Sequence, residues 1–331
     1  MSTSRSLAVV IPYYQRQPGL LLACVRSVLA QQGVPPCEVI VVDDASPHPA
    51  LDELAELLPA NPQVRVVLQA NAGPGAARNH GLDSVTPGIE FVAFLDSDDG
   101  WHPWYASDAL DAFAQGCDMF FANSQRYGSE GTRFDWSQGS GWELVPTAHR
   151  PLDAERGLHL YEGDFFDFAI HRSGIISTST LAYRFARLST LRFNTRLFNG
   201  QDRFFKLQLA QAARRVAFST RVSAIEGQGV NIFDSSQWGS AKGLNLLFNY
   251  IRLSKLVLAE IRLTAAQQAF VRAQLAESRR NFAVTSLHLW RAGTPIPPGT
   301  LRKAFVADPA TALMFLPNLM RAAARKLGRA S

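Results

Sequence analysis

The sequence predicts an α/β protein with a Rossmann-like, mixed but mainly parallel sheet flanked by helices, and with a helical C-terminal extension. Over the first 120 residues, short apolar runs rich in β-branched residues alternate with helix-like segments, which is the pattern of βαβ units. These runs are apolar throughout, as expected of strands that helices cover on both faces. Beyond about residue 240 the pattern is helical only. With 331 residues, 47% of them hydrophobic, the chain can form one large core or two modest ones.

The first part of the pattern gives four strands with a helix between successive strands. Pro49 marks the start of the second helix, because proline is favoured in the first turn. In such sheets ligands bind beyond the carboxyl ends of the strands, so the residues after each run are the candidates for a site. The expected strands are 7–11, 38–42, 64–68 and 90–95, and the expected helices are 19–32, 49–58 and 75–85.

The rest of the chain is mixed at first and then helical. Residues 125–160 are rich in Gly, Ser, Trp and Arg, and we expect a long variable loop there. The other expected elements are a strand at 117–124, a helix at 161–172, a strand at 176–183, a helix at 201–214, a strand at 215–219, helices at 241–262 and 264–290, and a basic stretch from 299.

Cysteine usage and hydropathy exclude several classes of protein. Cys24, Cys37 and Cys117 stand at unrelated spacings, which argues against a disulfide framework and against a thiolate zinc site. A reducing cytoplasm is therefore the expected compartment. The apolar stretch before Pro12 is too short for a signal peptide, and no apolar run reaches the length of about 18 residues that a membrane span needs.

Charge is distributed unevenly between the two parts of the chain. Residues 1–120 hold 5 basic and 14 acidic side chains, whereas residues 121–331 hold 28 basic and 14 acidic ones. Carboxylates at strand ends indicate a cation site, and the basic part indicates an anionic surface or substrate. The basic residues are scattered rather than clustered with aromatic residues, so nucleic acid is not an expected partner.

Three motifs follow the expected strands. Asp96 and Asp98 come directly after the strand at 90–95, where crowded carboxylates favour a divalent cation such as Mg²⁺ or Mn²⁺; capping of the next helix is the alternative.

Asp44 follows the strand at 38–42 and can accept hydrogen bonds from a base or a ribose, or can cap a helix. In the loop before the third helix, two glycines and Pro74 precede Arg78, an arrangement that suits a diphosphate; an ordinary tight loop with a surface arginine is the alternative.

In this order and at this spacing, the motifs resemble the nucleotide-binding half of glycosyltransferase family 2, whose members are inverting enzymes of the GT-A fold. The resemblance is close over residues 7–115 and recurs at 199–215. The motifs are VVIPYYQR, VIVVDDAS, NAGPGAARNHG and FVAFLDSDD. The resemblance implies three regions: 1–125 as the half that binds a nucleotide sugar, 126–239 as the acceptor-binding and catalytic half, and 240–331 as a helical region on a membrane surface or in an oligomer.

The resemblance also implies roles for individual residues. Asp44 would recognise the base, with Pro12 and Tyr14 bordering it. Arg78 would approach the diphosphate. The two remaining carboxylates, Asp96 and Asp98, would hold the ribose and the metal, which would be Mn²⁺ or Mg²⁺.

A catalytic base is implied at the start of the helix at 201–214. The segment FNGQDRFFKLQLAQAARRVAF resembles the family's Glu-Asp motif, and Asp202 falls on its aspartate, which deprotonates the acceptor. Gln201 replaces the usual glutamate. Without the family, a first-turn acid that stabilises the helix dipole would be the preferred interpretation of Asp202.

Two further segments carry weaker signals. The loop 227–239 has no histidine to complete a metal shell and offers only Gln228, Asn231 and Asp234, none of which is assigned as a ligand. The C-terminal segment combines short apolar runs with Arg321, Arg325, Lys326 and Arg329 and could lie on an anionic membrane surface, or pack as an ordinary terminal helix.

Together these observations predict a metal-dependent inverting glycosyltransferase, a hexosyl- or N-acetylhexosaminyl-transferase. It would move a sugar from a nucleotide diphosphate donor, UDP preferred over dTDP or GDP, to a hydroxyl of a growing glycan or lipid-linked glycan in bacterial cell-surface polysaccharide synthesis. We expect it in the cytoplasm, peripheral to the inner face of the membrane. The alternatives are a nucleotidyltransferase, which would need an N-terminal lysine although none precedes Lys206, and a degenerate nucleotide-sugar sensor or scaffold.

Overall fold

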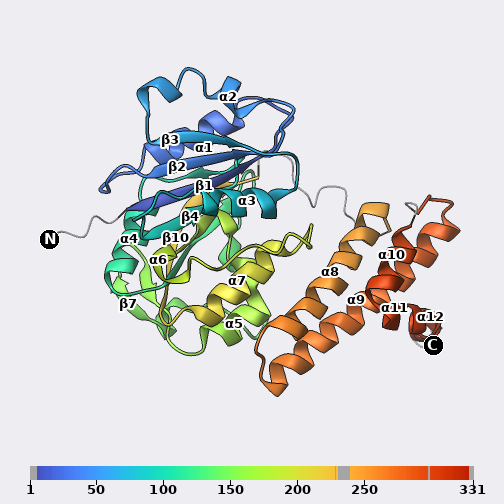
Figure 1. The fold of residues 1–331 in the computed structure, drawn as a ribbon. Helices are drawn as coiled ribbons and strands as arrows, with labels where there is room; N and C mark the ends of the chain where they lie inside the picture. Colours follow the sequence, from blue (N-terminus) through green and yellow to red (C-terminus); the bar gives the residue numbers. More distant parts are fainter. Residues whose placement is uncertain (1–5, 228, 230–238, 297–298, 328–331) are drawn as a thin grey trace. The chain divides into compact units, whose positions relative to one another are not determined.

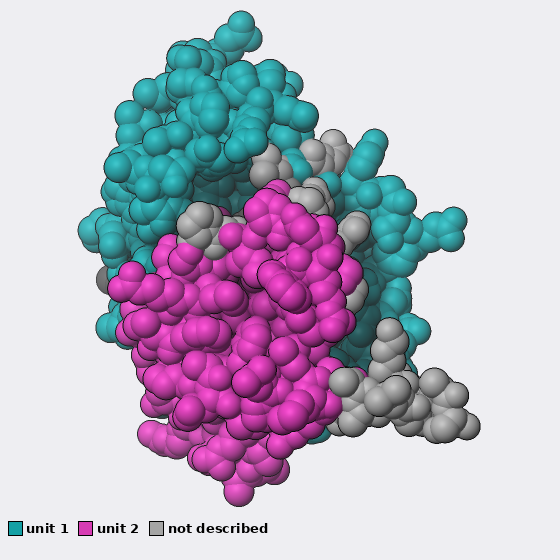
Figure 2. Space-filling view, turned by 90° about the vertical axis from the view of Figure 1, so that its right-hand side faces the viewer, with its two compact units in different colours: residues 1–195, 205–230 teal, residues 196–204, 231–331 magenta. Residues whose placement is uncertain are grey.

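The computed structural model describes residues 6–227, 229, 239–296 and 299–327 (Figure 1). The chain divides into two compact units, which Figure 2 colours separately. The first consists of residues 1–195 and 205–230, and the second of residues 196–204 and 231–331.

A single mixed sheet forms the first unit. Within the described residues its hydrogen-bonded order is β3-β2-β1-β4-β9-β6-β10-β8-β7, and β5 pairs with β10. Strands β1 to β4 run parallel, as do β6 and β10, whereas β9 is antiparallel to both β4 and β6. The strands are β1 Leu7–Tyr13, β2 Glu38–Asp43, β3 Val64–Leu68, β4 Phe91–Phe94, β5 Gly100–Trp101, β6 Met119–Arg126, β7 Arg150–Asp153, β8 Leu158–Leu160, β9 Leu181–Tyr183 and β10 Val216–Glu226.

Helices cover both faces of this sheet, so the predicted fold class is confirmed. Alternate residues of β1 face opposite sides: Val9 packs in the core with the residues of α1 and α4, while Val10 faces α3. Helix α3 approaches β1 closely at Gly81, where a Cβ would lie 2.3 Å from Cγ1 of Val10. The helices are α1 Leu20–Leu29, α2 Ala50–Glu53, α3 Pro74–Asp83, α4 Tyr105–Ala114, α5 Phe165–Arg172, α6 Phe185–Leu188 and α7 Gln201–Ala212.

Several expected elements differ in the structure, among them the strand expected at 176–183, which begins only at Leu181 after a 3₁₀ helix at Thr178–Thr180. The helix expected at 49–58 is only the four-residue α2, followed by turns and a 3₁₀ helix at Leu58–Ala60 that has Pro59 in its first turn. The loop expected at 125–160 contains the end of β6, two 3₁₀ helices at Arg133–Ser137 and Pro146–Ala148, and the hairpin of β7 and β8.

The hairpin joins the sheet because Leu158 and Leu160 bury their side chains while β8 pairs with β10. Strand β10 is itself longer than the expected strand at 215–219. It continues to Glu226, which brings its end to the site described below.

Among the described residues, five helices of the second unit follow Gly239. Helices α8 (Ala241–Glu260) and α9 (Ala265–Arg291) pack side by side, with Phe248 and Phe282 in the shared core (Figure 1). Thr264 and Gln267 form a capping box that starts α9. Helices α10 (Thr300–Ala307), α11 (Pro309–Leu313) and α12 (Phe315–Leu327) complete the unit. In the part of the chain that is described, no helix is both long and apolar enough to cross a bilayer.

Candidate functional site

The candidate site lies at the carboxyl ends of β1, β2 and β4. These three strands are parallel neighbours, so the segments that follow them meet at one edge of the sheet. Pro12 is buried in β1 opposite Val42, and Tyr14 is partly exposed just beyond the strand. The motif residues expected to form a site therefore start from the same edge.

The two aspartates after β2 have different local partners. Asp43 accepts hydrogen bonds from the backbone N–H groups of Ser46 at 2.7 Å and Ala50 at 2.8 Å, so it holds the turn that leads into α2. Asp44 makes no such bond to α2. The capping role considered for Asp44 thus belongs to Asp43.

The buried carboxylate of Asp44 instead holds the glycine-containing loop before α3. Its Oδ1 accepts from Nε2 of Gln69 and from the backbone N–H of Ala72, both at 2.7 Å, and its Oδ2 accepts from the N–H of Gly73 at 2.8 Å. A carboxylate oxygen accepts about two hydrogen bonds, so Oδ2 retains capacity for a ligand donor. Hydrogen bonds to Asp44 therefore hold the motif after β2 and the motif before α3 together.

Arg78 lies in α3 with its side chain directed to Asp96. The residue is only 4% exposed, its Nη2 donates to Oδ1 of Asp96 at 2.5 Å, and its Cζ lies 5.3 Å from the ring centre of Phe193. Among the described residues, Nε and Nη1 have no hydrogen-bond partner. Buried guanidinium nitrogens without partners are costly unless an acceptor is bound, and phosphate oxygens are among their preferred acceptors.

The carboxylates after β4 differ in exposure and in partners. Asp96 is partly exposed. Asp98 accepts from the N–H of Gly229 at 3.0 Å, and burial together with the charge of Asp96 raises its pKa to about 6. Asp99 is buried, accepts from Oγ of Ser179 at 2.5 Å and from the N–H of Gly227 at 2.8 Å, and its pKa is raised by burial and by the neighbouring carboxylates.

This donor set fits a hard divalent cation. The pKa of Asp98 is raised first by burial and then by the charge of Asp96, and a bound cation would favour the ionised carboxylate against both. Across residues 6–227, 229, 239–296 and 299–327, no group of three His, Cys, Asp or Glu side chains is placed to hold a metal. The chain would thus supply one or two carboxylates, Asp96 and Asp98, and leave the remaining positions to water and substrate, as Mg²⁺ and Mn²⁺ sites often do.

Helix capping by the Asp96 and Asp98 carboxylates is excluded. Helix α4 begins at Tyr105 with Trp104 in the N-cap position, and the first-turn N–H of Ala106 donates to Oε1 of Gln31 at 2.8 Å rather than to either aspartate. The alternative interpretation of the DSD motif as a helix start is wrong.

Several residues of this edge were not expected from the sequence. Gln15 is buried, donates from Nε2 to Oγ of Ser97 at 3.2 Å, and its Oε1 has no partner in the described part of the chain. Glu226, at the end of β10, is paired with Arg133 and accepts from Oγ of Ser124 at 2.5 Å; burial opposes ionisation, but these partners lower its pKa. Only Gln15 carried a signal, since it lies within the motif VVIPYYQR.

Gly229 allows the chain to approach Asp98. A Cβ on this glycine would lie 2.5 Å from Cβ and 2.6 Å from Oδ2 of Asp98, closer than real Cβ atoms come. Its neighbours Gln228, Asn231 and Asp234, considered for the metal shell, lie outside the described residues.

Asp202 belongs to the second unit. It lies in the first turn of α7, after Gly200, whose φ of 85° favours glycine and whose Cβ would lie 2.9 Å from Leu253. Burial raises the pKa of Tyr250, and the charge of Asp202 adds to that shift. Gln201 is buried, and its Oε1 has no hydrogen-bond partner among the described residues.

The family model for glycosyl transferase family 2 matches residues 8–176, a span that contains the ends of β1, β2 and β4. The chain belongs to glycosyl transferase family 2. It is 34% identical over 247 residues to the succinoglycan biosynthesis protein ExoW of Rhizobium meliloti, which covers 73% of this chain and 75% of ExoW. The predicted glycosyltransferase class is thereby confirmed over the nucleotidyltransferase alternative.

Solved structures share the fold of this family-2 glycosyltransferase at low identity. TarS of S. aureus in complex with UDP-GlcNAc has a TM-score of 0.54 at 18% identity, with 86% of this chain and 73% of that chain covered. The mannosyltransferase PcManGT of Pyrobaculum calidifontis, in complex with GDP-Man and Mn²⁺, has a TM-score of 0.54 at 15% identity, with 97% and 86% covered. The predicted GT-A fold is confirmed.

Proposed function

We propose that this glycosyltransferase is a metal-dependent inverting enzyme that moves a hexose or N-acetylhexosamine from a nucleotide diphosphate sugar, UDP preferred, to a hydroxyl of a growing glycan. One observation carries the proposal. Arg78 is buried and bonded to Asp96, and two of its nitrogens, beside the carboxylates after β4, have no partner within the described part of the chain. A purely structural ion pair would not need these free N–H groups, whereas the diphosphate of a donor would accept hydrogen bonds from them.

In this proposal, different residues of the chain bind different parts of the donor. Oδ2 of Asp44 accepts the imino N–H of a uracil base, with Pro12 and Tyr14 as its borders, while the carboxylates after β4 hold the ribose and the cation. Arg78 donates its free N–H groups to the diphosphate. When bound, Mn²⁺ or Mg²⁺ would neutralise charge on the departing diphosphate.

Inversion requires a base on the side of the sugar opposite the leaving diphosphate. We assign that role to Asp202, which takes the proton of the acceptor hydroxyl as its oxygen attacks the anomeric carbon. The bond from that carbon to the diphosphate oxygen breaks in the same step. At the neighbouring position, Gln201 stands where the family usually has a glutamate that contacts the acceptor. The glycan is therefore contacted by a neutral amide rather than by a carboxylate.

The relatives support a role in polysaccharide synthesis. ExoW is named for succinoglycan biosynthesis, and UDP-GlcNAc and GDP-mannose are the donors in the solved complexes of the same fold. We propose bacterial cell-surface polysaccharide or a lipid-linked oligosaccharide as the product, made at the inner face of the membrane. The division into a donor half at 1–125, an acceptor half at 126–239 and a helical region from 240 is part of this proposal.

Calorimetric titration of the purified chain with UDP, dTDP and GDP, each with and without Mn²⁺, tests the donor site. We expect UDP to bind most tightly and to need the metal. A donor-plus-acceptor assay should then release UDP. If no nucleotide binds under any condition, the proposal fails and the sensor or scaffold alternative takes its place.

A further inference from the structure

Helix α12 and the end of α11 expose part of their apolar side chains on the surface of the second unit. Leu313, Leu316 and Met320 are 78%, 69% and 66% exposed, and their spacing of three and four residues places them on one side. We call these three residues the outer face. Isolated exposed leucines are common on protein surfaces, but three aligned along one helical segment form a patch.

The inner side of the same segment holds buried polar side chains as well as Phe315, which packs against the shared core of α8 and α9. Asn318 and Thr311 are buried, and the Thr311 hydroxyl donates to Oδ2 of Asp308 at 2.6 Å. A helix that only covers a globular core keeps its apolar side chains inward and its polar side in water. The exposed outer face, together with buried polar groups on the inner side, therefore points to an apolar environment outside the unit.

Within residues 299–327 the exposed charges have one sign. Between residues 299 and 327 the sequence has a single acid, Asp308, which is buried and bonded to Arg279. Arg302, Lys303 and Arg321 are exposed on this part of the chain. An anionic partner is thus favoured over a neutral or cationic one.

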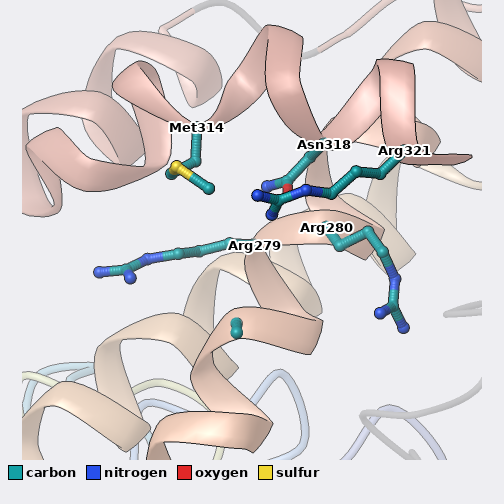
Figure 3. Close-up of a pocket in the computed structure, with 6 residues that line it drawn as sticks. Arg279, Arg280, Met314, Asn318 and Arg321 are labelled. Carbon is teal, nitrogen blue, oxygen red and sulfur yellow. The ribbon is translucent and has the colours of Figure 1, made fainter.

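A small cavity at the base of α12 adds to this pattern. Its volume is about 160 Å³, and it is lined by Ala276, Arg279, Arg280, Met314, Asn318 and Arg321, with no carboxylate among them. Figure 3 shows the side chain of Arg321 pointing into the cavity. Two hydrogen bonds commit Arg279 to Asp308, which leaves the guanidinium of Arg321 to meet an anion.

We propose that α11 and α12 dock on the surface of an anionic phospholipid bilayer. The outer face enters the boundary between headgroups and acyl chains, and Arg321 and the cavity receive a lipid phosphate. Apolar insertion and attraction to anionic lipid together describe an interfacial amphipathic helix. A second copy of the chain is the disfavoured occupant, because a symmetric contact through this face would bring the same cations together. The inference stands apart from the proposed transfer chemistry.

Co-sedimentation of the full chain with vesicles tests the proposal without any nucleotide. The two vesicle types are phosphatidylcholine alone and an equal mixture of phosphatidylcholine and phosphatidylglycerol. We expect the chain to pellet with the mixed vesicles only. Binding should weaken between about 0.1 M and about 1 M salt, because the screening length falls from about 10 Å to about 3 Å.

Substitutions on the outer face give the sharper readout. Leu316→Gln combined with Met320→Gln should lower the partition coefficient by about tenfold or more, because two apolar side chains no longer enter the bilayer. Arg321→Gln should lower it about fivefold, the factor that corresponds to about 1 kcal/mol per cation near an anionic surface. The matched control is Leu68→Gln, which changes a leucine that is 60% exposed on β3 and should leave binding unchanged.

Four results would overturn the proposal. The wild-type chain could stay in the supernatant with the mixed vesicles, or pellet equally with both vesicle types. The outer-face variant, Leu316→Gln with Met320→Gln, could bind the mixed vesicles as the wild type does. If that variant does not fold, the same result with Arg321→Gln would count. Sedimentation velocity could also reveal a dimer that the outer-face variant dissociates, which would assign the face to a second copy.

Discussion

The Nη2 atom of Arg78 lies 2.5 Å from Oδ1 of Asp96, so a residue of α3 and a residue after β4 form one ion pair at the edge of the sheet. The pair brings together two motifs that are 18 residues apart in sequence. Arg78 is buried whereas Asp96 is partly exposed. The carboxylate thus orients the guanidinium while remaining accessible to a ligand.

Replacing Arg78 tests whether its unpartnered nitrogens bind the donor. For Arg78→Gln we expect the donor Kd to rise at least about tenfold, because a charge-assisted contact to the diphosphate is lost. Arg78→Lys should recover only part of the affinity, since lysine keeps the charge but not the fork of donors. Calorimetry with UDP and Mn²⁺ measures both variants.

The control is Arg192→Gln, which removes a partly exposed arginine paired with Asp83 and should leave the Kd unchanged. Equal affinity in wild type and Arg78→Gln would make the ion pair with Asp96 purely structural.

Asp98→Ala tests the cation site. We expect Mn²⁺ to increase the UDP affinity of the wild type but not that of the variant. With EDTA present, the two proteins should bind UDP equally. Asp83→Ala, which removes an exposed carboxylate of α3, serves as the control. Metal-dependent affinity that survives in Asp98→Ala would remove this carboxylate from the site.

Gly229→Ala tests the backbone approach to Asp98. The added methyl group has no room beside Cβ of Asp98, so the segment must move and the 3.0 Å hydrogen bond to Oδ2 is expected to break. We expect a smaller loss of metal-dependent affinity than in Asp98→Ala, with the thermal unfolding midpoint unchanged. Gly174→Ala, at a glycine with no atom within 4 Å of the added Cβ, should be neutral in both measurements.

The sequence predicted the fold well because the determinants of β1 to β4 are local. Continuous apolar runs indicate buried parallel strands, and the rule for their carboxyl ends then locates the site edge. Strand 64–68 agrees with the structure at both ends. The start of α3 was expected within one residue, since Pro74 and the glycine before it mark a helix start.

Contacts distant in sequence could not be predicted in the same way. The hydrogen bond from Ser179 to Asp99 spans 80 residues, and the pairing of β8 with β10 depends on a strand of three residues. Neither has a local pattern strong enough to identify it. The bonds from Asp44 to the loop before α3 were hidden for a different reason, because backbone N–H donors leave no trace in residue identity.

Asp308 gives the second unit a pH-dependent stability. Burial on its own favours the neutral carboxyl, yet hydrogen bonds from Arg279 and Thr311, with the charge of Lys255, lower the pKa of Asp308. Because the folded-state pKa lies below the unfolded value of about 3.9, the stabilisation is present above that pH and is lost as the pH falls through the folded pKa.

Asp308→Asn should therefore lower the free energy of unfolding by about 2 kcal/mol at pH 7, because Arg279 loses a buried charged partner. The difference from wild type should shrink as the pH falls to about 3 and below. Urea unfolding at both pH values measures this. Glu277→Gln, which breaks an exposed pair with Arg280, is the control, and a difference that does not change with pH would contradict the assignment.

Asp202→Asn separates catalysis from donor binding. If Asp202 is the base, the rate of sugar transfer should fall at least about 100-fold while the Kd for UDP with Mn²⁺ stays within about twofold of wild type. Glu260→Gln, which removes an exposed carboxylate of the same unit, should affect neither quantity. A first-turn acid that only stabilises α7 would behave differently, since its loss would lower the unfolding midpoint and leave transfer intact. Retained transfer with reduced stability would thus assign Asp202 to the helix rather than to the reaction.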